Sequence, residues 1–107
     1  MSEDLAAASA AKQRAVVYAA DYLNKIGGDR VEHECREKLK EGCDELVLNF
    51  SKTELVNSVG ISILLGIIDS AANRGTRVIF SDVKDETVEL FDMLGVTRHV
   101  EINKQAN

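Results

Sequence analysis

The residues best placed to carry chemistry are Asn57 and Ser58, at the expected start of a helix. Either is a good N-cap, because its side-chain oxygen can accept a hydrogen bond from a free backbone N–H of the first turn. A phosphate on Ser58 would face the positive end of the helix dipole, so the fold could accept this modification. It would add about −1.5 to −2 charge units beside an apolar surface, which could switch off binding there. The residues alone favour capping, with regulation by phosphorylation as the alternative.

The other reactive side chains do not converge on a catalytic or metal site. His33 is expected on a surface helix among glutamates, and His99 in the last strand region. Cys35 and Cys43 are most simply two reduced thiols, because no ligand set surrounds them. The sequence contains no P-loop, Gly-x-Gly-x-x-Gly, His-Glu-x-x-His or nucleophile elbow. We therefore expect a protein that is not an enzyme and that needs no metal or cofactor.

Length and charge limit the organisation and the partners of the chain. Its 107 residues allow one domain, which we place at 14–107, after an alanine-rich tail or frayed helix at 1–13. A net charge of −5 without a basic cluster argues against nucleic acid or an anionic membrane as partner. The apolar stretch 61–68 is too short to span a bilayer, and the first residues lack a secretory signal. We expect a cytoplasmic protein.

Apolar patterns that alternate between strand and helix periodicity predict an α/β domain. Asn49 belongs to a short apolar run typical of a buried central strand. Gly27 and Gly28 are expected to break the chain, with Asp29 capping the helix that follows. Strands are predicted over 15–23, 46–50, 77–80 and 96–102, and helices over 29–42, 58–73 and from 82 or 85 to 95.

The helix after Ser58 has two apolar stripes. One has the spacing needed to dock on a sheet, and its members are Ile61, Leu64, Leu65, Ile68 and Ala72. Ile63 and Ile67 point roughly the opposite way, so either a neighbouring helix of the same domain covers them or they form a partner or homodimer surface. Gly60 could let a partner backbone approach closely, although a plain packing need explains it nearly as well.

Two runs in the middle of the chain resemble the signature of STAS domains. The first is the apolar strand Leu46-Val47-Leu48-Asn49-Phe50, and the second is Val56-Asn57-Ser58-Val59-Gly60-Ile61-Ser62-Ile63-Leu64-Leu65. The family's usual form is an apolar strand, a short loop, Asp-Ser-x-Gly and an apolar helix. Residues 75–80 are similar to a later strand of the family, and 89–96 to the penultimate helix of bacterial anti-sigma factor antagonists. The resemblance implies one STAS-like domain, with about four strands in a mixed sheet and helices packed against it.

The resemblance also implies a signalling role. The unmodified domain would bind an anti-sigma factor, usually a serine kinase of the histidine-kinase-like ATPase class. Phosphorylation of Ser58 would release it, and a phosphatase would reset it. The sequence departs from the pattern at Asn57, where the family usually has Asp, and at Gly27-Gly28, where an acidic loop residue is usual and Asp29 is the nearest acid. The expected partner-contact residues are Gly27, Asp29, Asn57, Ser58, Val59, Gly60, Ile63 and Ile67.

Two other roles are compatible with the same residues. A STAS domain that no longer switches could serve as an adaptor or scaffold subunit, with Ser58 acting only as a cap. Such a domain could also sense a small molecule at its strand ends. A weak homodimer is compatible with either role.

Overall fold

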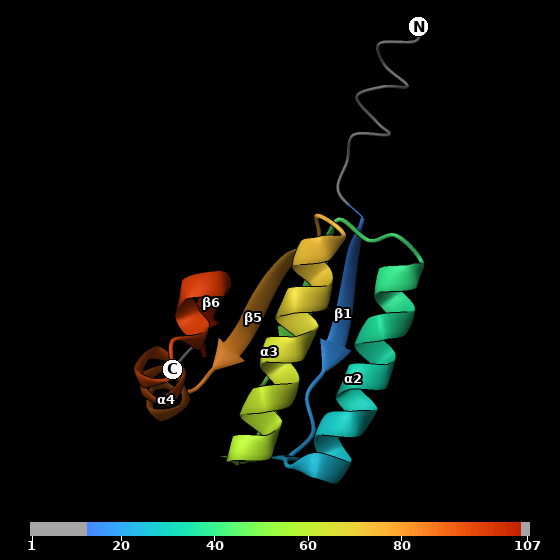
Figure 1. The fold of residues 1–107 in the computed structure, drawn as a ribbon. Coiled ribbons are helices and arrows are strands. Elements are labelled where there is room, and N and C mark those ends of the chain that lie inside the picture. Colours follow the sequence, from blue (N-terminus) through green and yellow to red (C-terminus); the bar gives the residue numbers. More distant parts are fainter. Residues whose placement is uncertain (1–12, 106–107) are drawn as a thin grey trace, which may run out of the picture.

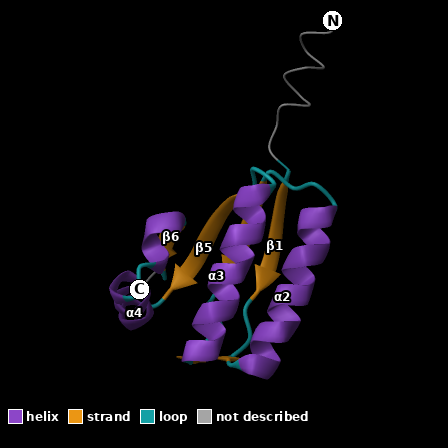
Figure 2. Ribbon diagram, viewed as in Figure 1, coloured by secondary structure: helices purple, strands orange, loops and turns teal. Residues whose placement is uncertain are grey.

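The computed structural model describes residues 13–105, in which three helices pack on one side of a four-stranded sheet (Figures 1 and 2). The order of the sheet is β1-β3-β5-β6, and a separate ribbon pairs β2 with β4. The strands are β1 Arg14–Tyr18, β2 Tyr22–Leu23, β3 Glu45–Asn49, β4 Leu55–Val56, β5 Arg77–Val83 and β6 Glu101–Lys104. The helices are α2 Lys25–Lys40, α3 Ser58–Asn73 and α4 Asp85–Met93, followed by the 3₁₀ helix η1 Val96–His99.

The expected α/β architecture is confirmed, whereas the expectation of a mixed sheet is wrong for the described residues. All three strand pairs of the larger sheet are parallel, and so is the β2–β4 ribbon. The reason is that a helix lies between successive strands of the sheet, and such crossovers return the chain in the same direction. The predicted tail at 1–13 lies outside the described residues, apart from Gln13.

The core lies between the inner face of the sheet and the helices. Val31, Cys35 and Leu39 of α2 are all buried, as their spacing predicts. Three phenylalanines fill the part of this core between β5 and α4, with ring centroids 4.9 to 5.6 Å apart in tilted or edge-on contacts. These are Phe50, Phe80 and Phe91, all almost fully buried.

Several element boundaries differ from the sequence prediction. The single strand predicted over 15–23 is two strands in the structure. β1 ends at Tyr18, and the chain then turns so that β2 pairs with β4. Helix α2 begins at Lys25 rather than Asp29, since Asn24 supplies its N-cap. The last predicted strand is a 3₁₀ helix followed by β6, because Gly95 turns the chain in a left-handed conformation with a φ of 79°.

The predicted sheet-facing stripe of α3 is also only partly right. Ile61, Leu64 and Ile68 are buried, but Leu65 is 38% exposed and Ala72 is exposed. Both exposed residues line a hollow beside His99 of η1, so they lie at the border of the core and not inside it.

Both cysteines are free thiols, and we expect them to differ sharply in reactivity. Burial raises the pKa of the Cys35 thiol to about 12 and also raises that of the half-buried Cys43 thiol. The thiolate is the reactive form, so a maleimide at pH 7 should label Cys43 slowly and Cys35 only after unfolding. Cys43→Ser is the matched control, and it should leave the folded protein unlabelled. Rapid labelling of that variant would contradict the buried position of Cys35.

Candidate functional site

The small β2–β4 ribbon brings two helix starts together at one end of the molecule (Figure 1). Tyr22 pairs with Leu55, and Leu23 pairs with Val56. Backbone hydrogen bonds extend this contact, since Glu54 N donates to Asp21 O at 2.7 Å and Asn57 N donates to Leu23 O at 3.1 Å. The starts of α2 and α3 are therefore fixed side by side.

Ser58 is the first residue of α3, and its side chain is exposed. The N-cap is Asn57, whose Oδ1 accepts a hydrogen bond from Gly60 N at 2.9 Å. Of the two candidate caps, the structure thus uses the asparagine, which leaves the Ser58 hydroxyl without a capping role. The first intrahelical acceptor is Asn57 O, which accepts from Ile61 N, so the amides of Ser58 and Val59 have no acceptor within the helix and the positive end of the helix is not neutralised there.

The start of α2 repeats the local structure of the start of α3. Asn24 caps α2 by accepting from Gly27 N at 2.9 Å, as Asn57 does from Gly60. Each cap follows a two-residue strand. After the cap come a polar residue, an apolar residue and a glycine, in that order. Lys25 therefore occupies the position in α2 that Ser58 occupies in α3. This repeat was not found in the sequence, where Gly27-Gly28 suggested a loop, although the two Asn-x-apolar-Gly segments would have signalled it.

The glycines of these segments are explained by packing within the domain. A Cβ on Gly60 would lie 2.1 Å from Leu23 O, and one on Gly27 would lie 2.4 Å from Tyr22 O. Both helices therefore pass so close to β2 that only glycine fits. Gly60 is buried, so the prediction that it contacts a partner is wrong. The packing alternative holds instead.

The second apolar stripe of α3 is covered by α2. Ile67 is only 1% exposed, which contradicts its prediction as a partner-contact residue. Ile63 is half-buried against the core, and a Cβ on Gly28 would lie 2.5 Å from its Cδ1. The neighbouring helix of the same domain, which was the alternative, is thus what covers this stripe. The sequence showed the two stripes of α3, but it did not show how closely the Gly27-Gly28 pair lets α2 approach α3.

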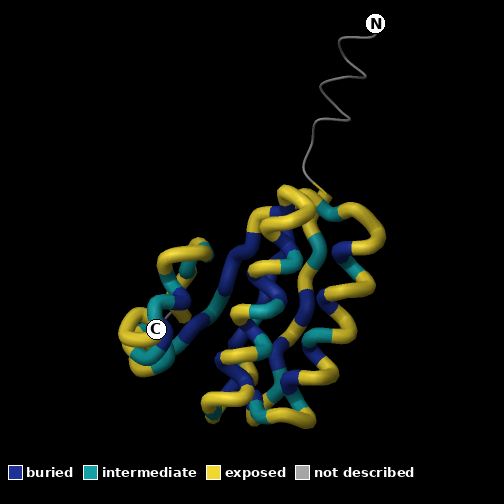
Figure 3. Tube along the Cα trace, viewed as in Figure 1, coloured by how far each residue is buried: buried dark blue, intermediate teal, exposed yellow. Residues whose placement is uncertain are grey.

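Four apolar side chains remain exposed around the two helix starts, at the end of the molecule where Figure 3 shows a group of exposed segments. We call them the helix-start patch: Tyr22, Ile26, Leu55 and Val59. Their exposed fractions run from 42% for Val59 to 77% for Ile26. Val59 was an expected contact residue, whereas the other three were missed, because the sequence gives no sign that β2 and β4 pair. The patch places apolar surface next to Ser58.

The acidic residue missed in the sequence is Asp21. It is exposed in the loop that follows β1, and its carboxylate accepts from Tyr22 N at 2.7 Å. The prediction that Gly27-Gly28 occupies this loop is wrong, because both glycines lie in the first turns of α2. Asp29 is exposed on α2 and pairs with Lys25 at 2.8 Å. An earlier end to the first strand would have brought Asp21 into the predicted loop.

A family model for the STAS domain matches residues 13–106, which is nearly the whole chain. The chain belongs to the STAS domain family. A comparison with curated proteins finds no match, so the assignment rests on the family model and on the fold.

Three solved structures share the STAS fold seen here. TM1081 of Thermotoga maritima, provisionally assigned as an anti-sigma factor antagonist, is 17% identical, with a TM-score of 0.71 over 83% of this chain and 79% of that one. The anti-sigma factor antagonist SpoIIAA in its unphosphorylated form is 12% identical, with a TM-score of 0.69 over 89% and 83%. A sulfate transporter family protein from Wolinella succinogenes is 15% identical, with a TM-score of 0.63 over 86% and 76%. At these identities the likeness shows the fold alone.

The described residues contain neither a membrane-spanning helix nor a metal-binding cluster. Within residues 13–105, no helix has the length and apolar character needed to cross a bilayer. In the same range, no group of three or more His, Cys, Asp and Glu side chains is arranged to hold a metal ion. Neither histidine is near Ser58 in the chain, and both are exposed.

Proposed function

We propose that this STAS domain is a cytoplasmic anti-sigma factor antagonist whose binding to its partner is switched by phosphorylation of Ser58. The observation that carries the proposal is the exposed Ser58 at the start of α3, next to the apolar side chains of the helix-start patch. The hydroxyl is a substrate for a kinase rather than a catalytic group. The partner supplies the ATP and the catalytic residues.

The cap arrangement supports a switch that leaves the fold intact. Asn57 holds the first turn of α3 through Gly60 N, so modification of Ser58 does not remove the cap. A phosphate at this position is stabilised by the helix dipole and by the free amides of the first turn. It adds a double negative charge and a hydration shell beside Val59 and Leu55. A partner that covers these side chains would have to desolvate the phosphate, which opposes binding.

The likeness to anti-sigma factor antagonists supports the proposed class of partner. Two of the similar structures are described as anti-sigma factor antagonists, one of them provisionally. We propose that the partner is an anti-sigma factor that is also a serine kinase of the histidine-kinase-like ATPase class, and that a phosphatase restores binding. Asp21 joins Ser58 and the helix-start patch as a proposed contact, since it lies beside β4 through its backbone bond to Glu54 N.

A constitutive adaptor is the second candidate. The exposed patch would serve an adaptor equally well, and the replacement of the family's usual Asp by Asn57 removes a charge that a kinase could recognise. The two functions differ in one result. Co-purification before and after phosphatase treatment should recover a kinase-like ATPase mainly in the treated sample if Ser58 is a switch, and equally in both samples if the domain is an adaptor.

Leu55→Asp is expected to weaken partner binding by about 30-fold, equal to about 2 kcal/mol, because it places a charge in the apolar contact. Leu55 is 61% exposed on the two-residue strand β4, so the free energy of unfolding should change by less than about 0.5 kcal/mol. Met93→Asp is the matched control, since Met93 is 79% exposed on α4, outside the helix-start patch. Isothermal titration with the partner measures both variants. Equal losses in the two would show that the helix-start patch is not the contact.

A further inference from the structure

The outer face of the four-stranded sheet carries side chains that the core does not use. The helices of the described residues all pack on the inner face of the sheet (Figures 1 and 2). Side chains alternate between the two faces of a strand, so the neighbours of the core residues Val17, Leu46 and Phe80 point outward. The outward side chains are Arg14, Val16 and Tyr18 of β1, Glu45, Val47 and Asn49 of β3, Arg77, Ile79 and Ser81 of β5, and Glu101 of β6.

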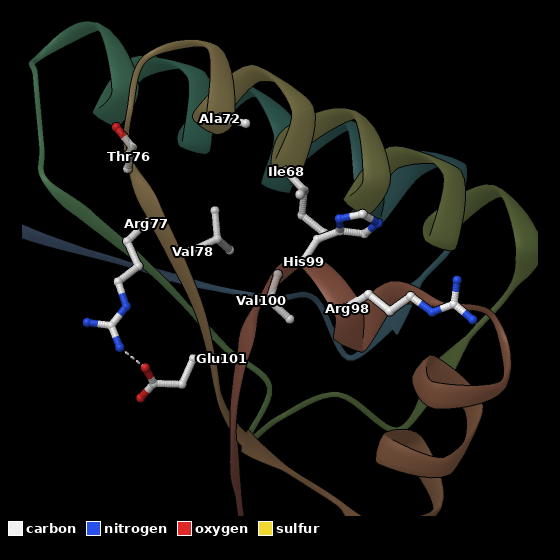
Figure 4. Close-up of a pocket in the computed structure, with 9 residues that line it drawn as sticks. All are labelled: Ile68, Ala72, Thr76, Arg77, Val78, Arg98, His99, Val100 and Glu101. Atoms are coloured by element: carbon white, nitrogen blue, oxygen red, sulfur yellow. Dashed lines mark hydrogen bonds and ion pairs between the residues drawn. The ribbon is translucent and has the colours of Figure 1, made fainter.

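The first row across this face is a ladder of alternating charge. Arg14 is the register partner of Glu45, and Glu45 is the register partner of Arg77. Ion pairs join them, with N–O distances of 2.8 Å from Arg14 to Glu45 and 3.2 Å from Arg77 to Glu45. Arg77 also pairs with Glu101, on the side of β5 opposite to Val78 (Figure 4). The ladder therefore has no net charge, although the whole chain carries −5.

The two ends of the ladder are accessible and have opposite charges. The side chain of Arg14, on the edge strand β1, is 58% exposed, and that of Glu101, on the edge strand β6, is 42% exposed. The side chain of Glu45 in the middle is only 5% exposed. A twofold axis parallel to the strands, between β3 and β5, would place Arg14 of each copy opposite Glu101 of the other. In this orientation the ladder is complementary to itself.

The next rows of the face add apolar contact. Val16, Val47 and Ile79 lie side by side in the register, and none of the three belongs to the core cluster. Val47 and Ile79 are only 6% and 4% exposed, so the exposed apolar surface lies mainly on β1, where Val16 is 45% and Tyr18 is 55% exposed. The same twofold axis lays β1 of one copy over β6 of the other. Both exposed side chains are then covered, which favours association.

The size of the face limits the strength of such a contact. Four strands about 4.8 Å apart, with five residues of about 3.3 Å each, give a face of about 19 by 17 Å. A contact of this extent is at the low end of specific interfaces, at roughly 1,200 Å² of total buried area, where complexes are weak. Sheets that pack face to face keep their strand directions within about 30°, so the rows of the two copies stay nearly aligned.

We infer that the outer face of the sheet binds a second copy of this chain, in a weak twofold dimer in which Arg14 of each copy pairs with Glu101 of the other. Neither Ser58 nor any residue of the helix-start patch lies on this face. The dimer therefore presents two separate helix-start patches, one from each copy. The contact between copies does not depend on the proposed switch at Ser58, so either can fail without the other.

Sedimentation equilibrium of the full chain tests the dimer. Between about 10 µM and about 1 mM protein, it should show a monomer–dimer equilibrium with a Kd on the order of 100 µM. Over the same range, ¹H–¹⁵N correlation spectra should show shifts at the amides of Val16, Val47 and Ile79 and none at Ile26. A protein that stays monomeric at the highest concentration would overturn the inference, and so would a dimer whose shifts fall on the helix-start patch.

Two charge reversals test the orientation of the copies. Arg14→Glu and Glu101→Arg should each weaken self-association by at least about tenfold, because each creates two like-charge contacts in the dimer. An equal mixture of the two variants should associate as the unmodified chain does, since positions 14 and 101 of the two different copies again carry opposite charges. Arg30→Glu is the matched control, because it makes the same charge change at an exposed position on α2 and should leave self-association unchanged.

Melting curves show whether each variant is folded, since Arg14→Glu removes one of the two cations beside the buried Glu45. If it unfolds, Arg14→Gln and Glu101→Gln replace the reversals, and each should weaken self-association about fivefold through the loss of two exposed ion pairs. A mixture of folded reversal variants that stays monomeric would overturn the pairing of Arg14 with Glu101. Equal weakening by Arg30→Glu, or unchanged association of the two glutamine variants, would overturn it as well.

Discussion

Gly60→Ala is expected to destabilise the domain by about 3 kcal/mol, which corresponds to a fall of about 15 °C in melting temperature. The added Cβ would lie 2.1 Å from the carbonyl oxygen of Leu23, a backbone atom that cannot move without breaking the β2–β4 ribbon. The start of α3 would have to shift away from β2. Thermal and urea unfolding of the two proteins measure the loss.

Gly66→Ala is the matched control for this prediction, because it makes the same change in the same helix. A Cβ on Gly66 meets no atom within 4 Å, so alanine should stabilise the helix by about 0.5–1 kcal/mol. The two substitutions should therefore have opposite signs. Similar effects would contradict the close contact between α3 and β2.

Ser58→Asp is expected to weaken partner binding by about 100-fold, equal to about 2.8 kcal/mol, while the free energy of unfolding changes by less than about 0.5 kcal/mol. The carboxylate lies at a helix start, where negative charge is favourable, but it introduces an unpaired charge beside Val59 and Leu55. Titration calorimetry with the partner measures the first effect, and urea unfolding measures the second.

Ser58→Ala separates the loss of the hydroxyl from the gain of charge. It should bind the partner as the unmodified domain does, and it should not be released by the kinase and ATP. Asn57→Ala is a second control, since loss of the cap should cost about 1 kcal/mol of stability without adding charge. If Ser58→Ala binds as weakly as Ser58→Asp, the hydroxyl itself is a contact and charge repulsion is not the cause.

The apolar periodicity of the sequence, together with its glycines and helix-capping residues, was sufficient to predict the order of the main strands and helices. The central strand, the start of α3 at Ser58 and the buried face of α2 all follow from local pattern, because each depends on residues close together in the chain. The exposure of Ser58 could also be anticipated. A serine beside a better cap is left at the surface of the first turn.

The features that were missed depend on contacts between distant segments. The β2–β4 ribbon consists of two-residue strands, too short for any periodic signal, yet it fixes Tyr22 beside Leu55. Ile67 could not be assigned to the interior, because its cover depends on how closely α2 approaches α3. Asp21 was hidden inside an overlong predicted strand. Each error came from tertiary contacts that local propensity does not contain.

The most direct test of the proposed switch follows phosphate on Ser58 and affinity in the same sample. The domain is incubated with the co-purified kinase and ATP, its phosphate is located by peptide mass spectrometry, and its affinity for the kinase is measured before and after. A single phosphate on Ser58 with about 100-fold weaker binding, restored by phosphatase, is the predicted result. An unmodified Ser58, or a phosphorylated one that binds with unchanged affinity, would contradict the account.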